Sequence, residues 1–411
     1  KSEPWENYGV VGISIIGTSQ IVPGLTLARM IKKRYPHLFI VLGGPILSVI
    51  TENLRKWPEF FDEFCHAIIT LEGEEPLNQL LTAVKSGSSL DRVPNLIYKD
   101  NGQVKRSKQK VTVRFSEIPS PTFDGLPINL YFSPFPIFPI LQSRGCYWGR
   151  CTFCTHSSIY GQRYSLHKSC AMVDQLESFS KKYKARYFTF SDEAVSPRAL
   201  NDLSDLIIKR GLDIRGMVMV RFEKKMDAGF FYKIKKAGFN FLFYGLESAN
   251  NRILSLMQKG NSLKRACHIL RMSREAGIWN HLFLFFGFPT ETWEEAMETI
   301  EFLKENKENI HSIAPGVFTL NRDSAIHHHP EKFSITRVID PPDMDISTYL
   351  GFEISKGMSM QSAQEASNLC LETGKKLFPS NNIWRGMPRE HFLLYLDRYE
   401  GEALNGNDSI Q

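Results

Sequence analysis

The sequence lacks any apolar run long enough to cross a membrane, and its charges nowhere form a block of one sign. The longest apolar stretches, such as residues 241–244 and 282–286, fall far short of the roughly 20 residues that a spanning helix needs. The net charge of +6 comes from 50 basic and 44 acidic residues spread along the chain. Such a distribution is typical of a solvated surface, so we expect neither a membrane nor a nucleic acid as partner.

Cysteine is also scarce. The chain has 7 cysteines in 411 residues, and three of them lie close together. An odd, unevenly spaced set is unlike a disulfide framework and indicates metal chemistry in a reducing compartment. We therefore expect a cytoplasmic protein. Its hydrophobic share of 42% and charged share of 23% are typical of globular domains, and its length predicts two or three of them.

The first 88 residues alternate short apolar runs with helical patterns. This alternation predicts a doubly wound, Rossmann-like α/β unit. We expect its strands at residues 8–16, 38–42 and 67–70, and its helices near residues 23–35 and 76–86. Residues 89–136 contain an Asp-Asn-Gly turn and then several prolines, which predicts a hairpin and a linker.

A second alternation of strands and amphipathic helices follows the linker. The strand-like runs are residues 137–143, 186–191, 216–220, 239–245, 281–287 and 315–320. Repeated βα units of this length predict a partial (βα)6 barrel, similar to part of a TIM barrel, over residues 137–322. Residues 323–411 are mainly helical in pattern. The predicted fold class is thus α/β, with a Rossmann-like half domain, a partial barrel and a helical carboxyl-terminal region.

A cluster of potential metal ligands lies directly after the first predicted barrel strand. Cys146, Cys151 and Cys154 form a C-x4-C-x2-C array. Three thiolates in one loop can bind three irons of a cubane cluster and leave the fourth iron open to another ligand. A structural zinc ion normally takes four ligands, the fourth of which His156 could supply. Unligated or disulfide-bonded cysteines are a further alternative, and the spacing favours the iron-sulfur cluster.

This array resembles the cluster loop of the radical S-adenosylmethionine (SAM) superfamily. The usual loop is C-x3-C-x2-C with an aromatic residue before the last cysteine, as Phe153 is here. The present loop has one residue more between its first two cysteines. The resemblance implies a [4Fe-4S] cluster on the three thiolates, with SAM bound at the open iron. It also implies that reductive cleavage of SAM yields a 5′-deoxyadenosyl radical, which abstracts hydrogen from a substrate.

Further motifs of the same family follow in the expected order. The resemblance implies that an acidic element contacts the amino group of SAM, that an arginine contacts its carboxylate, and that G-L-E-S and G-x-P-x-E elements line the cofactor site. The residues concerned are Ser191, Asp192, Glu193, Arg221, Glu247, Ser248, Gly287 and Pro289. Each motif alone is common at a strand-to-helix turn. All of them follow predicted strands, where barrel enzymes hold their sites.

The first 88 residues resemble the carboxyl half of a cobalamin-binding domain. In that family, S-x-L and G-G elements line the cavity for the dimethylbenzimidazole tail. Ser14, followed after Ile16 by 26 residues and then Gly43 and Gly44, matches their spacing. A D-x-H-x-x-G element carrying the axial histidine would precede Ser14 in a region that the sequence does not include. An incomplete amino terminus, a vestigial domain and a half domain that only packs on the barrel remain open.

The favoured function is cobalamin-dependent methylation of a carbon in a peptide or another natural product, as in the maturation of ribosomally made peptides. The resemblance implies an electron donor such as a flavodoxin or ferredoxin. A cobalamin-free alternative is peptide epimerisation or another radical rearrangement, in which Cys370 returns a hydrogen atom to the substrate; the competing interpretation makes Cys370 a core residue. Transfer-RNA modification ranks lower because no basic RNA-binding module is visible. A scaffold without catalysis conflicts with the intact cysteine array.

Overall fold

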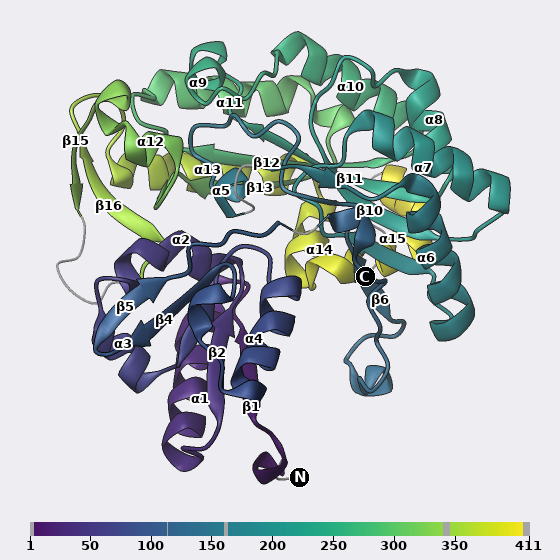
Figure 1. Cartoon of the computed structure of the whole chain (residues 1–411). Coiled ribbons are helices and arrows are strands. Elements are labelled where there is room, and N and C mark those ends of the chain that lie inside the picture. The colour runs from purple at the N-terminus through teal and green to yellow at the C-terminus, as the bar shows by residue number, and fades with distance from the viewer. Residues whose placement is uncertain (1–3, 113, 160–162, 340–345, 406–411) are drawn as a thin grey trace.

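The computed structural model describes residues 4–112, 114–159, 163–339 and 346–405. Two α/β units lie one above the other in Figure 1, with the amino-terminal unit below and the larger unit above. Within the described ranges, no helix combines the length and the apolar character that crossing a bilayer requires.

The amino-terminal unit is built on a five-stranded sheet of order β1-β2-β3-β4-β5. Its strands are β1 (Val10–Ser14), β2 (Phe39–Gly43), β3 (Ala67–Ile69), β4 (Leu96–Asp100) and β5 (Gln103–Arg106). The first three strands are parallel and the last two antiparallel. The helices of this unit are α1 (Ile21–Arg34), α2 (Pro45–Leu54), α3 (Pro58–Glu63) and α4 (Glu74–Ser86). The Rossmann-like alternation expected from the sequence is confirmed.

The predicted boundary at residue 88 is too early. The β4–β5 hairpin, which we assigned to the linker, pairs with β3 and extends the first sheet. Its side chains explain this: Leu96 and Ile97 are both wholly buried, one in the apolar cluster on each side of the sheet. A strand with two apolar faces is stable only where both are covered. The linker therefore begins after β5.

The larger unit is an open barrel whose six strands are all parallel, in the order β13-β12-β11-β10-β9-β6. Its strands are β6 (Ile137–Ile140), β9 (Tyr187–Phe190), β10 (Arg215–Val220), β11 (Phe239–Glu247), β12 (Trp279–Phe286) and β13 (Ser312–Val317). All six predicted strands are present. Three short elements lie between β6 and the next long helix along the chain. They are β7 (Ser143–Arg144), α5 (His156–Ile159) and β8 (Ser165–Leu166), and β7 pairs with β8.

Helices cover the outside of this sheet and begin where the sequence supplies caps. They are α6 (Ser169–Tyr183), α7 (Pro197–Arg210), α8 (Ala228–Lys236), α9 (Asn251–Leu256), α10 (Leu263–Glu275) and α11 (Trp293–Glu305). Side-chain oxygens accept hydrogen bonds from the first-turn N–H groups of five of them, at Ser196, Asp227, Asn250, Ser262 and Thr292. Such caps satisfy otherwise unpaired donors and fix each strand-to-helix turn, which is where the site residues lie.

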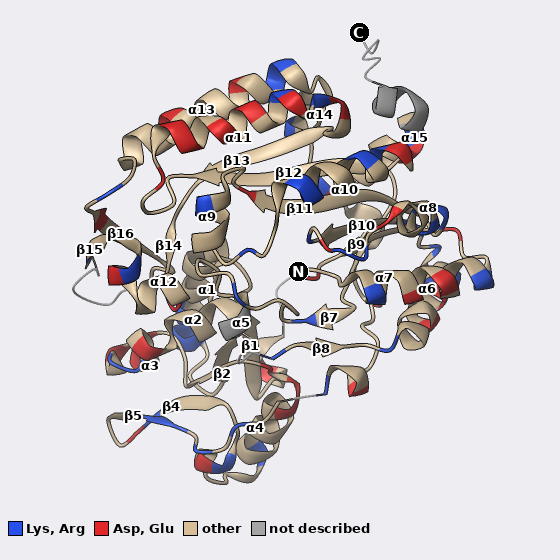
Figure 2. Ribbon diagram, turned by 90° about the horizontal axis from the view of Figure 1, so that it is seen from above, with Lys and Arg blue, Asp and Glu red and all other residues tan. Residues whose placement is uncertain are grey.

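The carboxyl-terminal region is mainly helical, as expected, and also contains a small sheet that was not predicted. A small antiparallel sheet of order β14-β16-β15 precedes its long helix. The elements are β14 (Leu320–Asn321), α12 (Ala325–His328), β15 (Ile335–Ile339), β16 (Tyr349–Ile354), α13 (Met360–Leu377), α14 (Ser380–Gly386) and α15 (Phe392–Asn405). Figure 2 shows α13 beside α11, over the β13 side of the barrel.

Helix α15 closes the amino-terminal end of the barrel. Phe392 packs against Phe241 and Trp279, which lie near the starts of β11 and β12. The Asp397 carboxylate accepts hydrogen bonds from Arg215 at 2.7 Å and from Tyr187 at 2.8 Å. Because this end is plugged by side chains, the open end that can admit ligands is the one formed by the carboxyl ends of the strands.

Candidate functional site

The three cysteines lie in one loop between β7 and α5, at the carboxyl end of the barrel. The loop starts at Gly145, whose φ of +76° is rare for other residues, and a Cβ there would lie 2.1 Å from the carbonyl oxygen of Arg163. The Thr152 N–H donates to the Met257 carbonyl at 3.0 Å, and the Asn321 side chain donates to the Phe153 carbonyl at 3.2 Å. The loop path is thus fixed by α9 on one side and β14 on the other.

The thiols in this loop are free and partly exposed. Burial raises the pKa of Cys151, and raises the pKa of Cys154 to about 12. The cysteines lie close enough for a thiolate on Cys146 to raise the pKa of Cys151 further, whereas Lys259 and Arg221 lower it. Metal binding would release these protons, and the two cations would then face the negative charge of the thiolates.

The surroundings of His156 bear on the zinc alternative. Among the described residues, no three His, Cys, Asp or Glu side chains converge closely enough to hold one metal ion. A cubane gives each thiolate its own iron, whereas a structural zinc ion takes all its ligands on one metal. The His156 Nδ1 atom instead lies 2.9 Å from Glu193 Oε1.

The longer spacing between the first two cysteines is accommodated by an anchored tryptophan. The Trp148 indole N–H donates to the Gln258 carbonyl at 2.8 Å. Its ring covers Gly260, where a Cβ would lie 2.5 Å from the ring. The Arg221 guanidinium stacks on the Trp148 ring, with its Cζ atom 4.4 Å from the ring centroid. Trp148 thus joins the cluster loop to the arginine predicted to bind the SAM carboxylate.

Arg221 itself is held from several directions at the end of β10. It is 6% exposed, and its Nη2 atom donates to the Lys259 carbonyl. Its Nε atom lies 3.3 Å from Glu223 Oε1, which also accepts the Tyr147 hydroxyl at 3.1 Å. The guanidinium is therefore oriented before any ligand binds, which lowers the entropic cost of binding a carboxylate.

Glu247 forms a buried ion pair above Gly245. Its carboxylate lies 2.6 Å from Lys259 Nζ, and the two side chains are 12% and 9% exposed. A Cβ at Gly245 would lie 2.4 Å from Glu247 Oε1 and 2.7 Å from Lys259 Nζ. Glu247 has a φ of +69°, and the pairing register between β11 and β12 shifts between Gly245 and Glu247. The strained turn is thus built so that Glu247 meets Lys259 beside the cluster loop.

Asp192, Ser248 and Ser191 occupy the predicted turns with different surroundings. The buried Asp192 carboxylate accepts hydrogen bonds from the Gln142 and Ser143 N–H groups and from the Ser143 hydroxyl. Burial raises its pKa to about 6. The wholly buried Ser248 hydroxyl accepts the Asn250 N–H. Asp192 and Ser248 therefore shape the loops, whereas Ser191 is exposed and Glu193, beside Cys154 and His156, faces the cluster loop.

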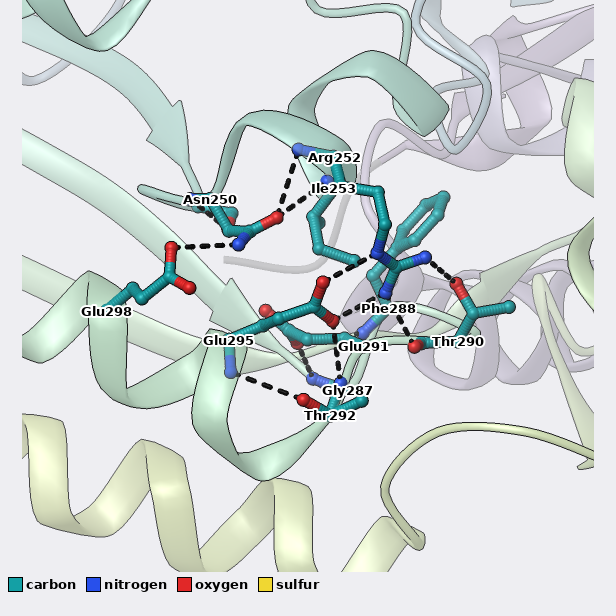
Figure 3. A network of polar contacts seen from close by, with 11 residues as sticks. Asn250, Arg252, Ile253, Gly287, Phe288, Thr290, Glu291, Thr292, Glu295 and Glu298 are labelled. Atoms are coloured by element: carbon teal, nitrogen blue, oxygen red, sulfur yellow. Dashed lines mark hydrogen bonds and ion pairs between the residues drawn. The ribbon is translucent and has the colours of Figure 1, made fainter.

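The G-x-P-x-E element follows β12 and forms a rigid turn (Figure 3). Glu291 is wholly buried and accepts the Gly287 N–H at 2.6 Å and the Phe288 N–H at 3.3 Å. Burial raises the pKa of Glu291 to about 7. Gly287 and Pro289 are buried, and a Cβ at Gly287 would lie 2.4 Å from the Cβ of Ala363. This turn therefore contacts α13 of the carboxyl-terminal region directly.

The predicted cobalamin residues lie at the carboxyl end of the first sheet. Ser14 pairs with Gly43 across β1 and β2, and Ser14 is exposed. Gly44 has a φ of +109°, and a Cβ there would lie 2.3 Å from the Ile15 carbonyl oxygen. The Ile15 backbone thus requires glycine at position 44, and Gly43 and Gly44 are both partly exposed at this edge. Helix α2, which starts at Pro45, contacts α5 next to the cluster loop.

An ion pair joins the two units at the same place. Arg144, two residues before Cys146, donates to Glu74 at 2.5 Å and to Glu72 at 3.2 Å. Glu72 lies in the turn that follows β3, and Glu74 is the first residue of α4. Burial alone would lower the pKa of Arg144, but the two carboxylates raise it by more, so the pKa is raised overall. The carboxyl ends of both sheets therefore face the cluster loop.

Cys370 does not reach this site. It is 0% exposed on α13 and belongs to the apolar core between that helix and the barrel sheet. Burial raises the pKa of its thiol to about 12. The structure therefore favours the packing interpretation of Cys370 over its assignment as a hydrogen-atom donor.

Three residues that shape the site were not identified from the sequence as contacts between segments: Lys259, Arg144 at the end of β7, and Trp148 in the cluster loop. A charged residue next to a glycine, as in Lys259-Gly260, is the available sequence signal, because a buried cation requires a partner.

Comparisons with known proteins agree with these observations. Residues 140–303 match the family described as the radical SAM superfamily. An uncharacterized methyltransferase of Pyrococcus horikoshii is 29% identical over 304 residues, which cover 72% of this chain and 64% of that protein. The hopanoid C-3 methylase of Methylococcus capsulatus is 24% identical over 66% of this chain and 51% of its own length. The chain thus spans between half and two thirds of these relatives.

Solved structures share the fold across both units. The cobalamin-dependent SAM radical enzyme OxsB, with aqua-cobalamin and SAM bound, superposes with a TM-score of 0.73 at 18% identity over 97% of this chain and 64% of its own. The radical SAM methyltransferase TsrM of Kitasatospora setae, with tryptophan and a SAM analogue bound, gives a TM-score of 0.67 at 18% identity over 82% of this chain and 70% of its own. Residues 140–303 thus match the radical SAM superfamily, and the chain has the overall fold of these two enzymes.

Proposed function

We propose that this chain is a radical SAM enzyme that methylates a carbon atom of its substrate with the help of cobalamin. The observation that carries this proposal is the joint placement of two ligand surfaces. The partly exposed Gly43 and Gly44 and the three-cysteine loop lie at facing ends of the two sheets, and Arg144 bridges the two units. Neither surface alone would favour a methyl transfer over other radical chemistry.

Different residues would hold each of the three ligands. Cys146, Cys151 and Cys154 would hold the cluster, and Arg221 and Glu193 would orient the carboxylate and amino groups of SAM. When bound, the cluster and SAM supply a 5′-deoxyadenosyl radical, and cobalamin carries the methyl group. The small residues at the end of the first sheet would let cobalamin approach the backbone.

The class of substrate is part of the proposal. A small natural product or a peptide fits a site closed at one end by α15 and bordered by the carboxyl-terminal region. The proteins that resemble this chain are named for such reactions: one methylates a hopanoid, and another is a bacteriochlorophyllide d C-8(2)-methyltransferase. A flavodoxin or ferredoxin of the cytoplasm would supply the electron.

A cobalamin-retention assay tests the first half of the proposal. Anaerobically reconstituted protein is mixed with hydroxocobalamin, passed through a desalting column and read by absorbance. Gly44→Val places a side chain against Ile15 at a positive φ, and should abolish retention while iron content stays unchanged. Gly87→Val changes a glycine that also has a positive φ but lies at the end of α4, in open space, and serves as the matched control. Equal retention by the Gly44 variant would contradict cobalamin binding at this edge.

A labelling experiment tests the second half and separates the alternatives. The reconstituted protein is incubated with SAM bearing a CD3 group, a low-potential reductant and a small-molecule extract in heavy water. Methylation predicts a product that carries the CD3 group or part of it. Cobalamin-free epimerisation predicts one solvent deuteron in the product and no added methyl group, which would refute the proposal. The buried position of Cys370 argues against that outcome.

A further inference from the structure

A cavity of about 420 Å³ opens at the free edge of the barrel sheet. Strand β13 is the last strand of that sheet, and no strand among the described residues pairs with its outer edge. The cavity lies between this edge, α13 and α14. Its lining includes residues 313–317 of this edge, Ser367 of α13, and Trp384 and Arg385 of α14. Its size is within the range of small-molecule sites.

Three hydrogen-bond donors in this lining have no acceptor. Ser367 is 5% exposed, yet its hydroxyl makes no hydrogen bond with any described residue. The Trp384 indole N–H also has no acceptor in the described part of the chain, whereas those of Trp148 and Trp279 each have one. The Arg385 guanidinium forms no hydrogen bond or ion pair within the described ranges. Ser367 is buried, Trp384 is half-buried and Arg385 is exposed, and all three line the cavity, so their donors are available to a ligand bound there.

The acidic groups around Arg385 are already engaged or distant. Arg385 lies close enough to Glu372 to lower the pKa of that carboxyl, although Lys375 has the larger effect. Glu372 accepts a hydrogen bond from Lys375 Nζ at 2.6 Å. The guanidinium therefore retains its donors for a ligand. A planar fork of this kind binds a carboxylate or a phosphate in a bidentate manner.

The aromatic wall of the cavity is held rigidly. The Trp384 ring lies 4.5 Å from the His281 ring, 5.4 Å from Phe392 and 5.5 Å from Phe241, measured between centroids. These three residues fix it from the barrel side. A ligand that stacks on the opposite face would meet a preorganised surface, which lowers the entropic cost of binding.

The edge of β13 favours a small ligand over an added strand. Ile313 N–H points outward and is capped by the Asn381 side chain at 2.9 Å. Two residues later on the same edge, Pro315 has no N–H to offer. Proline at a sheet edge prevents pairing with another strand. The small residues Ala314 and Gly316 leave space beside this edge for side-chain-sized groups.

Helix α13 places the cavity next to the predicted cofactor site. Ala363 contacts Gly287 of the G-x-P-x-E turn, and Ser367 follows Ala363 by four residues on the same helix. One helical turn separates them, a rise of about 6 Å. A ligand held at Ser367 would thus lie beside the turn expected to contact SAM.

We propose that this cavity is the substrate site and that it takes an organic anion with a flat apolar body. Arg385, the Trp384 N–H and the Ser367 hydroxyl bind the anionic group, and the Trp384 ring contacts the body. The name "substrate" rests on the proposed function, whereas the anion binding does not. The anionic group is a carboxylate or a phosphate, since both accept these donors.

Binding of three matched probes tests this inference. 2-Naphthoate, 2-naphthyl phosphate and neutral 2-naphthol are titrated into the reconstituted protein and followed by isothermal calorimetry. We expect one or both anions to bind at least about tenfold more tightly than the neutral probe, as an ionic hydrogen bond predicts. The stronger of the two identifies the group as carboxylate or phosphate.

Variants locate the binding. Arg385→Gln should weaken the preferred anion at least about tenfold and leave 2-naphthol unchanged, and Arg385→Lys should restore part of the affinity. Lys376→Gln, which removes an exposed charge from α13 outside the cavity, should have no effect. Equal affinity for all three probes, or equal losses in the Arg385→Gln and Lys376→Gln variants, would overturn the inference. Failure of the CD3-labelling experiment with anion binding intact would overturn the proposed function alone.

Discussion

Replacing Lys259 by methionine should destabilise the barrel strongly, because it leaves the Glu247 carboxylate buried without a partner. The two charged atoms lie 2.6 Å apart, and the side chains are 12% and 9% exposed. At an effective dielectric constant of about 20, Coulomb's law gives an attraction of about 6 kcal/mol at this separation. Desolvation of the two ions offsets much of it. Removing one partner of such a pair typically costs about 3–5 kcal/mol.

The assay is thermal unfolding of the reconstituted protein, with iron content measured on the same samples. A loss of about 3 kcal/mol corresponds to a fall in Tm of about 6–12 °C for a unit of this size. Lys264→Met, at an exposed position on α10, is the matched control and should not change the Tm. The reasoning also predicts that Glu247→Gln combined with Lys259→Met recovers part of the loss, since no charge then stays unpaired. A Lys259→Met variant as stable as the control would refute it.

Three further predictions follow from the contacts of the site. Gly245→Ala places a Cβ 2.4 Å from Glu247 Oε1 and should raise the Kd for SAM at unchanged iron content; an unchanged Kd would contradict the role of Gly245. Trp148→Ala should raise the KM for SAM more than it lowers kcat, because it frees Arg221, and Trp148→Phe should lie between it and the native protein; a pure kcat effect would argue against this. Burial raises the pKa of Glu291 to about 7 from an ordinary value near 4.5, so this group costs stability progressively as pH rises from about 4.5 to 7. Between pH 5 and pH 8, urea unfolding should therefore show the stability of Glu291→Gln rising by about 2.5 kcal/mol relative to the native protein, and a pH-independent difference would refute it.

The barrel strands and their motifs were predictable because each is a local pattern. An apolar run followed by Glu247 or by Gly287 signals a strand end and a turn without knowledge of the rest of the fold. The β4–β5 hairpin was misassigned because its partner β3 lies about thirty residues earlier, and pairing between separated segments leaves no mark in either one. The small sheet of the carboxyl-terminal region was missed for the same reason.

The site shows the same division between local and distant information. The cysteines were identified from their spacing, and Glu193 and Arg221 from the resemblance of their motifs to the radical SAM superfamily. The hydrogen bonds of Asp192 to Gln142 and Ser143, and the burial of Cys370, depend on packing between elements that the sequence does not specify. The donors that converge from α13 and α14 on the cavity at β13 are likewise visible only once those elements are placed in space.

The central claim is that three thiolates in one loop hold a cluster with one iron open to SAM. Electron paramagnetic resonance of the anaerobically reconstituted and reduced protein tests it directly, with iron and sulfide determined on the same sample. The account predicts a reduced [4Fe-4S] signal that changes when SAM is added and is lost in a variant with Cys146, Cys151 and Cys154 replaced by alanine. Protein without iron and sulfide, zinc in their place, or a cluster signal indifferent to SAM would contradict it.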